Sequence, residues 1–154
     1  MTPNTAFAAE QPLWSPPQSP QSSAVTVAPI AVGVDWIRDA GHLVEELRGL
    51  MPDWDGYNSP AISVAAIESA YKLIRCMGRN DVPVPRVAPV TGGGVALTFL
   101  NASRVLELEV LPDGSVEFLC AEKHSGGSHT ADEGQLSIPR LFEAQYLVDW
   151  LLAD

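Results

Sequence analysis

The sequence is poor in basic residues, which limits the kinds of partner that it can bind. It has nine Lys and Arg against nineteen Asp and Glu, and its formal net charge at pH 7 is -10. Proteins that bind the phosphate backbone of nucleic acids use clustered basic side chains to displace counterions. Because this chain has few basic residues, we expect no direct nucleic-acid binding. The same charge steers the chain toward a basic partner.

Cysteine and long hydrophobic runs are also scarce. The two cysteines, Cys76 and Cys120, fall in separate apolar patterns and form no disulfide framework or Cys-x-x-Cys site, which favours a reducing compartment. The first ten residues lack the basic region of a secretory signal, and no apolar stretch is long enough to span a membrane. We therefore expect a cytoplasmic protein without a membrane partner.

The sequence lacks the motifs that dictate a reaction. It has no Gly-x-Ser-x-Gly elbow and no established zinc-ligand spacing. Thr91-Gly92-Gly93-Gly94 is not followed by the Lys-Ser or Lys-Thr of a phosphate loop, and it fits a hairpin turn better. We expect neither enzymatic activity nor a cofactor.

The chain is expected to begin with a flexible arm. Residues 1–32 contain six prolines, a Gln/Ser-rich stretch and one charged residue, Glu10. This is the composition of a linker or a disordered segment. Leu13 and Trp14 are large apolar groups in that context and are candidates for partner binding, although Trp14 folding back onto its own domain is an equal alternative. Residues 33–154 are expected to form a single domain with one core.

The pattern of residues 33–154 predicts an α+β domain with the element order ααββββα. A first amphipathic helix must end before Pro52, and a second begins after the N-cap Ser63 and ends at Gly78. A last helix opens around Ser137 and Pro139. Between the second and last helices the apolar period changes to two, which predicts strands at 86–90, 94–100, 105–111 and 115–121.

These strands are expected to form an antiparallel four-stranded meander with the helices packed on one face. Pro112-Asp113-Gly114 predicts a tight turn that pairs Glu109 with Glu117 and places Leu108 near Phe118. The Gly/Ser-rich residues 124–134 are expected to be a mobile loop.

The predicted register puts Glu107, Glu109 and Glu117 on the sheet face opposite the apolar residues. Like charges on neighbouring strands reduce stability. Such a face is either fully solvated or neutralised by a basic partner, and we take these three glutamates as candidate partner-binding residues.

A dense turn joins the two predicted helices. In Asp53-Trp54-Asp55-Gly56-Tyr57, Gly56 is expected at positive φ and the two aromatic rings are expected to be buried between the helices and the sheet. The alternative is a small metal-dependent or acid/base hydrolase that uses Asp53 and Asp55 with His124 and His129, which requires the four side chains to converge.

A resemblance rests on Trp54-Asp55-Gly56-Tyr57, on Ser59-Pro60-Ala61-Ile62-Ser63 before a helix, and on Leu106-Glu107-Leu108-Glu109 before Pro112-Asp113-Gly114. The chain resembles a family of small uncharacterised bacterial proteins with a Trp-Asp-Gly turn, a Pro-Ile-Ser helix start and a following β-meander. The resemblance covers about residues 43 to 153 and departs from the pattern at Ala61. It implies a bacterial origin and the fold, but no activity.

Together these patterns favour a non-enzymatic bacterial protein-binding module that engages a larger, basic protein. Accessory, adaptor, immunity and antitoxin-like subunits suit such a domain. A further alternative to the hydrolase is an acidic surface that imitates nucleic acid.

Overall fold

A computed structural model describes residues 35–153, with only the backbone described for Asp35, Ile138 and Pro139. These residues belong to the second of two units into which the chain divides, Ala31–Asp154. The predicted arm at 1–32, with the candidates Leu13 and Trp14, lies outside the described residues.

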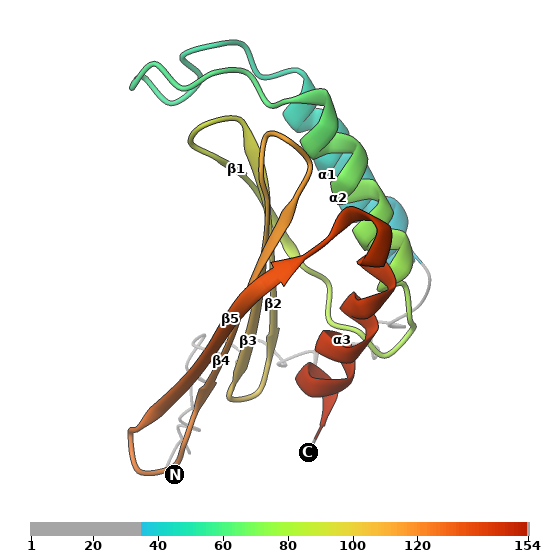
Figure 1. Ribbon diagram of the computed structural model, residues 1–154, viewed down its shortest axis with the longest axis vertical. Coiled ribbons are helices and arrows are strands. Elements are labelled where there is room, and N and C mark those ends of the chain that lie inside the picture. The colour runs from blue at the N-terminus through green and yellow to red at the C-terminus, as the bar shows by residue number, and fades with distance from the viewer. Residues whose placement is uncertain (1–34, 154) are drawn as a thin grey trace, which may run out of the picture. The chain divides into compact units, whose positions relative to one another are not determined.

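The described residues form two layers, with helices on one face of an antiparallel sheet (Figure 1). Helix α1 (Asp35–Arg48) and helix α2 (Val64–Cys76) lie side by side, and a 3-10 turn, η1 (Ile138–Glu143), leads into α3 (Ala144–Leu152). The predicted α+β class, the meander and the placement of the helices on one face are confirmed. Within the described part, no helix has the length and apolar character needed to cross a membrane.

The sheet has one strand more than predicted. Its strands follow chain order: β1 (Arg86–Val90), β2 (Gly94–Asn101), β3 (Arg104–Val110), β4 (Val116–Lys123) and β5 (His129–Leu136). The prediction of a mobile loop at 124–134 was therefore wrong for residues 129–134. Strand β5 is at the edge of the sheet and almost entirely exposed, so it carries no apolar alternation that would reveal it.

The β3–β4 register is the predicted one. Glu109 pairs with Glu117, and Leu108 pairs with Phe118. The turn closes with the Leu111 N–H donating to the Ser115 carbonyl at 2.8 Å. Gly114 has φ +86 and packs so closely on α2 that a Cβ at this position would meet Ser69 Oγ at 2.9 Å, so the turn requires glycine.

The core lies between the helices and the sheet. Trp36 of α1 packs its ring against the edge of Phe99, with centroids 6.2 Å apart and an interplanar angle of 88°. The Trp36 Nε1–H donates to the Arg79 carbonyl at 3.1 Å. The largest fully buried side chains come from both layers: Phe99, Ile67, Leu73, Ile74, Met77, Leu97, Leu106, Leu108 and Leu151. Since these sheet residues all point toward the helices, the opposite face is left to other side chains.

The end of α3 is held to the sheet by Arg104. Its guanidinium donates to the carbonyls of Trp150, at 2.7 Å, and of Ala153. It also lies 5.4 Å from the centroid of the Trp150 ring and pairs with Glu122, with Nε and Oε1 3.3 Å apart. A cation therefore sits where the helix dipole and the unpaired carbonyls of the last turn favour one.

The predicted burial of Trp54 and Tyr57 was wrong. Tyr57 is 88% exposed, and Trp54 is half-buried, with its Nε1–H donating to the Pro60 carbonyl at 3.1 Å. The loop that carries both rings extends past the end of the sheet, so neither layer covers it (Figure 1). Gly56 has φ +73, as predicted.

Candidate protein-binding surface

The sheet face opposite the helices, called here the outer face, carries most of the predicted site residues. Side chains alternate between the faces along each strand. The residues between Leu106, Leu108 and Val110 on β3 are Glu107 and Glu109, so both project from the outer face. Pairing brings further outer-face residues from the next two strands: Glu117 and Leu119 on β4, and Glu133 and Gln135 on β5.

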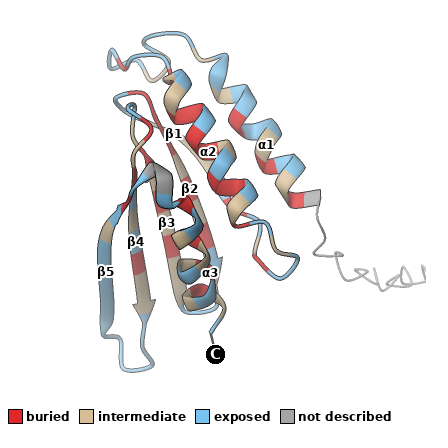
Figure 2. Cartoon of the chain, turned by 45° about the vertical axis from the view of Figure 1, so that its right-hand side comes forward, coloured by how far each residue is buried: buried red, intermediate tan, exposed pale blue. Residues whose placement is uncertain are grey.

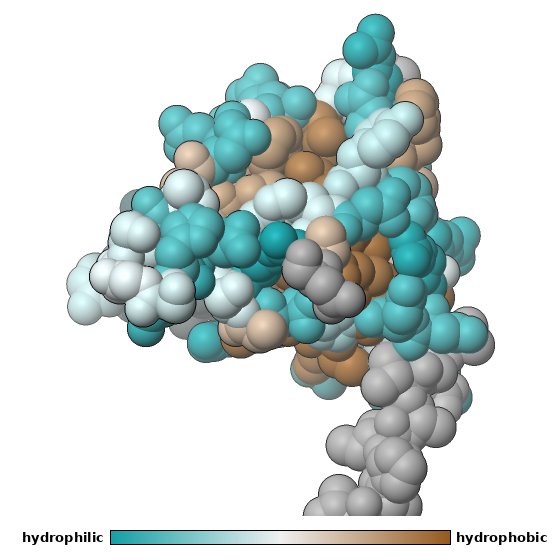
Figure 3. Space-filling model, turned by 90° about the horizontal axis from the view of Figure 1, so that it is seen from below, coloured by the Kyte–Doolittle hydropathy of each residue, from teal (hydrophilic) through white to brown (hydrophobic). Residues whose placement is uncertain are grey.

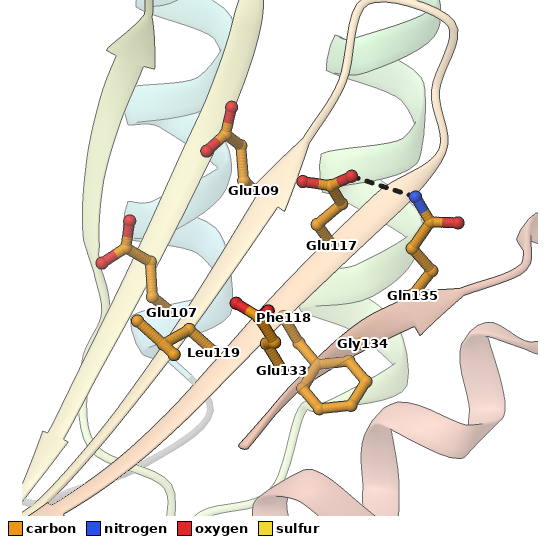
Figure 4. Close-up of a pocket in the computed structure, with 8 residues that line it drawn as sticks. All are labelled: Glu107, Glu109, Glu117, Phe118, Leu119, Glu133, Gly134 and Gln135. Atoms are coloured by element: carbon orange, nitrogen blue, oxygen red, sulfur yellow. Dashed lines mark hydrogen bonds between the residues drawn. The ribbon is translucent and has the colours of Figure 1, made fainter. Parts of the chain in front are cut away.

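These residues form two rows that run across three strands. One row is Glu109, Glu117 and Gln135, and the other is Glu107, Leu119 and Glu133. Together with Phe118 and Gly134 they line a shallow hollow of about 470 Å³, called here the acidic hollow (Figure 4). Leu119, the middle residue of the second row, is 38% exposed. The structure thus brings the three predicted glutamates together and adds a fourth.

The negative charge of the acidic hollow is not neutralised within residues 35–153. Glu117 accepts a hydrogen bond from the neutral amide of Gln135 at 2.9 Å, and none of the ion pairs among these residues involves the four glutamates. Two basic residues share the outer face by register, Arg86 at the start of β1 and Lys123 at the end of β4. Directly opposed carboxylates such as Glu109 and Glu117 reduce stability by roughly 0.2–1 kcal/mol.

Sequence patterns missed Glu133 and Gln135 because β5 was not predicted. Leu119 was also missed, although its strand was predicted and its place two residues after Glu117 puts it on the same face. The number of residues between β4 and the last helix could have revealed β5. The residues after the Gly126-Gly127 turn are enough for a strand that returns along β4, and a Gly-containing turn after a strand is a hairpin signal.

The carboxylates of the loop between α1 and α2 hold the loop's own backbone. Asp55 accepts from Ser59 Oγ at 2.6 Å and from the Tyr57 N–H at 3.0 Å. The hydrogen bond from Ser59, with that from Tyr57, lowers the pKa of the Asp55 carboxyl below its usual value. Asp53 accepts from the Asn58 N–H at 2.7 Å. Both carboxylates therefore stabilise the conformation of this loop.

The structure does not bring the two histidines to these acids. His124 and His129 flank the β4–β5 turn, where His124 Nε2 lies 3.1 Å from Thr130 Oγ1. That turn and the loop of Asp53 and Asp55 lie at opposite ends of the sheet (Figure 1), separated by the length of β4, roughly 25 Å. No cluster of three His, Cys, Asp or Glu side chains able to hold a metal occurs in the described part.

Cys76 and Cys120 lie in separate elements, α2 and β4, as their apolar sequence patterns predict. Cys120 is buried and Cys76 is half-buried. Burial raises the pKa of the Cys120 thiol to about 11, with a smaller contribution from the Asp132 charge. Because the thiolate is the nucleophilic form, this thiol is unreactive near neutral pH.

In the view from the end that carries the β4–β5 turn, hydrophobic side chains are seen between the helical side and a projection of intermediate to hydrophilic side chains (Figure 3). The projection, on the left of the view, is the β4–β5 turn.

Comparisons of the chain with protein-family models, with curated proteins and with solved structures found no match. The resemblance to the small bacterial family therefore stays an expectation from the residues, and function has to be inferred from the geometry of the outer face.

Proposed function

We propose that this protein is a non-enzymatic binding module that engages a larger, basic protein through the outer face of its sheet. The observation that carries the proposal is the acidic hollow. Glu107 and Glu133 flank the exposed Leu119, and Glu109 and Glu117 lie in the neighbouring row, on a face that no helix of the described part covers. An exposed apolar side chain beside several carboxylates gives a partner both contact area and electrostatic complementarity.

The charge distribution supports this proposal over a purely structural role for the face. The opposed Glu109 and Glu117 reduce the stability of the free domain, and a basic partner would remove that repulsion. The net charge of -10 would also speed encounter with a basic surface. Such a module suits an accessory, adaptor, immunity or antitoxin-like subunit in a bacterial cytoplasm, and it needs no cofactor.

Affinity capture with matched variants tests the proposal. The full chain is immobilised as wild type, as Glu109→Lys with Glu117→Lys, and as Glu46→Lys with Glu68→Lys, a control with the same charge change at exposed helix positions. A basic protein from the host lysate should bind the wild type and the control but not the first variant. Its association with the wild type should slow as salt is raised.

Equal capture by all three proteins would contradict a role for the outer face. If DNA displaces the captured protein from the module, the captured protein binds the module through its own nucleic-acid site. Imitation of nucleic acid would then explain the acidic hollow.

A further inference from the structure

The two edges of the sheet differ in how they are protected. Strand β1 contains Pro89, which has no N–H to offer, and α1 packs against this strand. Strand β5 contains no proline and is exposed along almost its whole length (Figure 2). No backbone hydrogen bond among residues 35–153 uses its outer side. Strand β5 is therefore an open edge, of the kind to which another strand can pair.

The hydrogen bonds around β4 identify which backbone groups of β5 are free. The Lys123 N–H donates to the Ser103 carbonyl, toward β3, and the next residue, His124, donates to the Ser128 carbonyl, toward β5. Antiparallel strands alternate in this respect. The groups of Thr130, Asp132 and Gly134 therefore face β4. Those of the alternate residues face the open edge: Ala131, Glu133 and Gln135.

The two faces of the open edge differ in chemistry. The free backbone groups belong to residues whose side chains share the outer face with the acidic hollow. On the other face a cleft of about 260 Å³ lies beside β5, lined by Cys120, Leu147 and Trp150 together with Thr130, Ala131 and Asp132. A strand added to β5 would therefore place successive side chains alternately at an acidic surface and at a largely apolar cleft.

We propose that the partner presents an extended segment that adds to β5 as an antiparallel strand, with Arg or Lys over the acidic hollow and apolar residues between them over the cleft. This inference rests on the proposed function. Main-chain hydrogen bonds would supply affinity, and the two surfaces would supply specificity. A second copy of this chain is disfavoured, because it would bring the Asp132 and Glu133 carboxylates of two copies together.

A synthetic peptide tests the inference on the full-length chain. The probe is a fluorescent, end-capped peptide of alternating Arg and Val, and its binding is measured by anisotropy. In the proposed register the Arg residues lie opposite Ala131 and Glu133, so their amide N–H groups face β5 while those of Val face solvent. Methylating the Arg amides should weaken binding about tenfold or more, whereas methylating the Val amides, which leaves charge and composition equal, should change it by less than about threefold.

Variants separate this inference from the proposed function. Glu133→Lys should weaken binding of the unmethylated peptide about tenfold, and Glu68→Lys on α2 should leave this binding unchanged. Weakening by Glu133→Lys with equal binding of the two methylated peptides would overturn strand addition and leave the acidic surface intact. No binding of the unmethylated peptide, or equal binding by all three proteins, would overturn both. If methylating the Val amides weakens binding more than methylating the Arg amides does, the proposed antiparallel register is wrong.

Discussion

Replacing Arg104 by Ala should destabilise the domain more than replacing any exposed arginine, because one guanidinium holds the end of α3 to the sheet. The Arg104 side chain is 16% exposed, and its partner Glu122 is 25% exposed. The substitution removes the ion pair, two hydrogen bonds to helix carbonyls and the contact with the Trp150 ring. It also leaves the Glu122 carboxylate largely buried without a cation.

The magnitude follows from these contacts. A hydrogen bond from a charged group contributes about 1.5–3 kcal/mol, and a cation over an aromatic ring about 0.5–2 kcal/mol. The contributions do not add fully, because the same guanidinium makes all of them. Breaking a buried ion pair by removing one partner costs about 3–5 kcal/mol, and the partial exposure of this pair places the expected loss near 3 kcal/mol.

Urea unfolding followed by circular dichroism measures this loss. The control is Arg140→Ala, because Arg140 is 67% exposed and pairs with Glu143 only within one turn, at 3.5 Å. The control should change the free energy of unfolding by less than about 0.5 kcal/mol. If Arg104→Ala lies within about 1 kcal/mol of the wild type, the anchoring of α3 by Arg104 is wrong.

Three further predictions concern other parts of the domain. Trp54→Ala should cost about 1 kcal/mol in urea unfolding, since the ring is half-buried, whereas a loss of 3 to 5 kcal/mol would indicate a core ring. Iodoacetamide at pH 9 should alkylate Cys120 at least about tenfold more slowly than free cysteine, because burial raises its pKa to about 11; equal rates, seen by peptide mass spectrometry, would refute this. Glu117→Gln should stabilise the domain by about 0.2–0.5 kcal/mol at low salt, and an equal gain in Glu46→Gln would show that the opposition to Glu109 is not the cause.

The part of the fold that depends on apolar periodicity could be predicted from the sequence. The alternation through Leu106, Leu108 and Val110 and the turn at Gly114 determine both the face and the register of β3 and β4, because a shift of one residue would bury the glutamates. That is why Glu107, Glu109 and Glu117 were found as neighbours on one surface.

Strand β5 could not be predicted in the same way. Its sequence, His-Thr-Ala-Asp-Glu-Gly-Gln-Leu, buries only Leu136. It is held by backbone pairing to β4 and by the Phe118 ring, which lies so close to Gly134 that an added Cβ would be 2.7 Å away. Neither interaction leaves a periodic signal in the sequence.

The predicted burial of the aromatic rings in the loop at Trp54 was wrong for a different reason. Its turn residues predicted a tight, glycine-containing loop, and the positive φ of Gly56 agrees. Local chemistry does not specify whether a layer lies behind the loop, and here it extends past the end of the sheet, so Tyr57 stays exposed. The core instead receives Trp36 from α1, which packs against Phe99 of β2.

Amide hydrogen exchange of the full chain, with and without the basic protein recovered by affinity capture, tests the central claim most directly. Binding on the outer face and the β5 edge should slow exchange in residues 129–136, above all at the free N–H groups of Ala131, Glu133 and Gln135, and should leave α1 and α2 unchanged. Slower exchange confined to α1, α2 or the loop between them would contradict the account, because it would place the partner away from the acidic hollow.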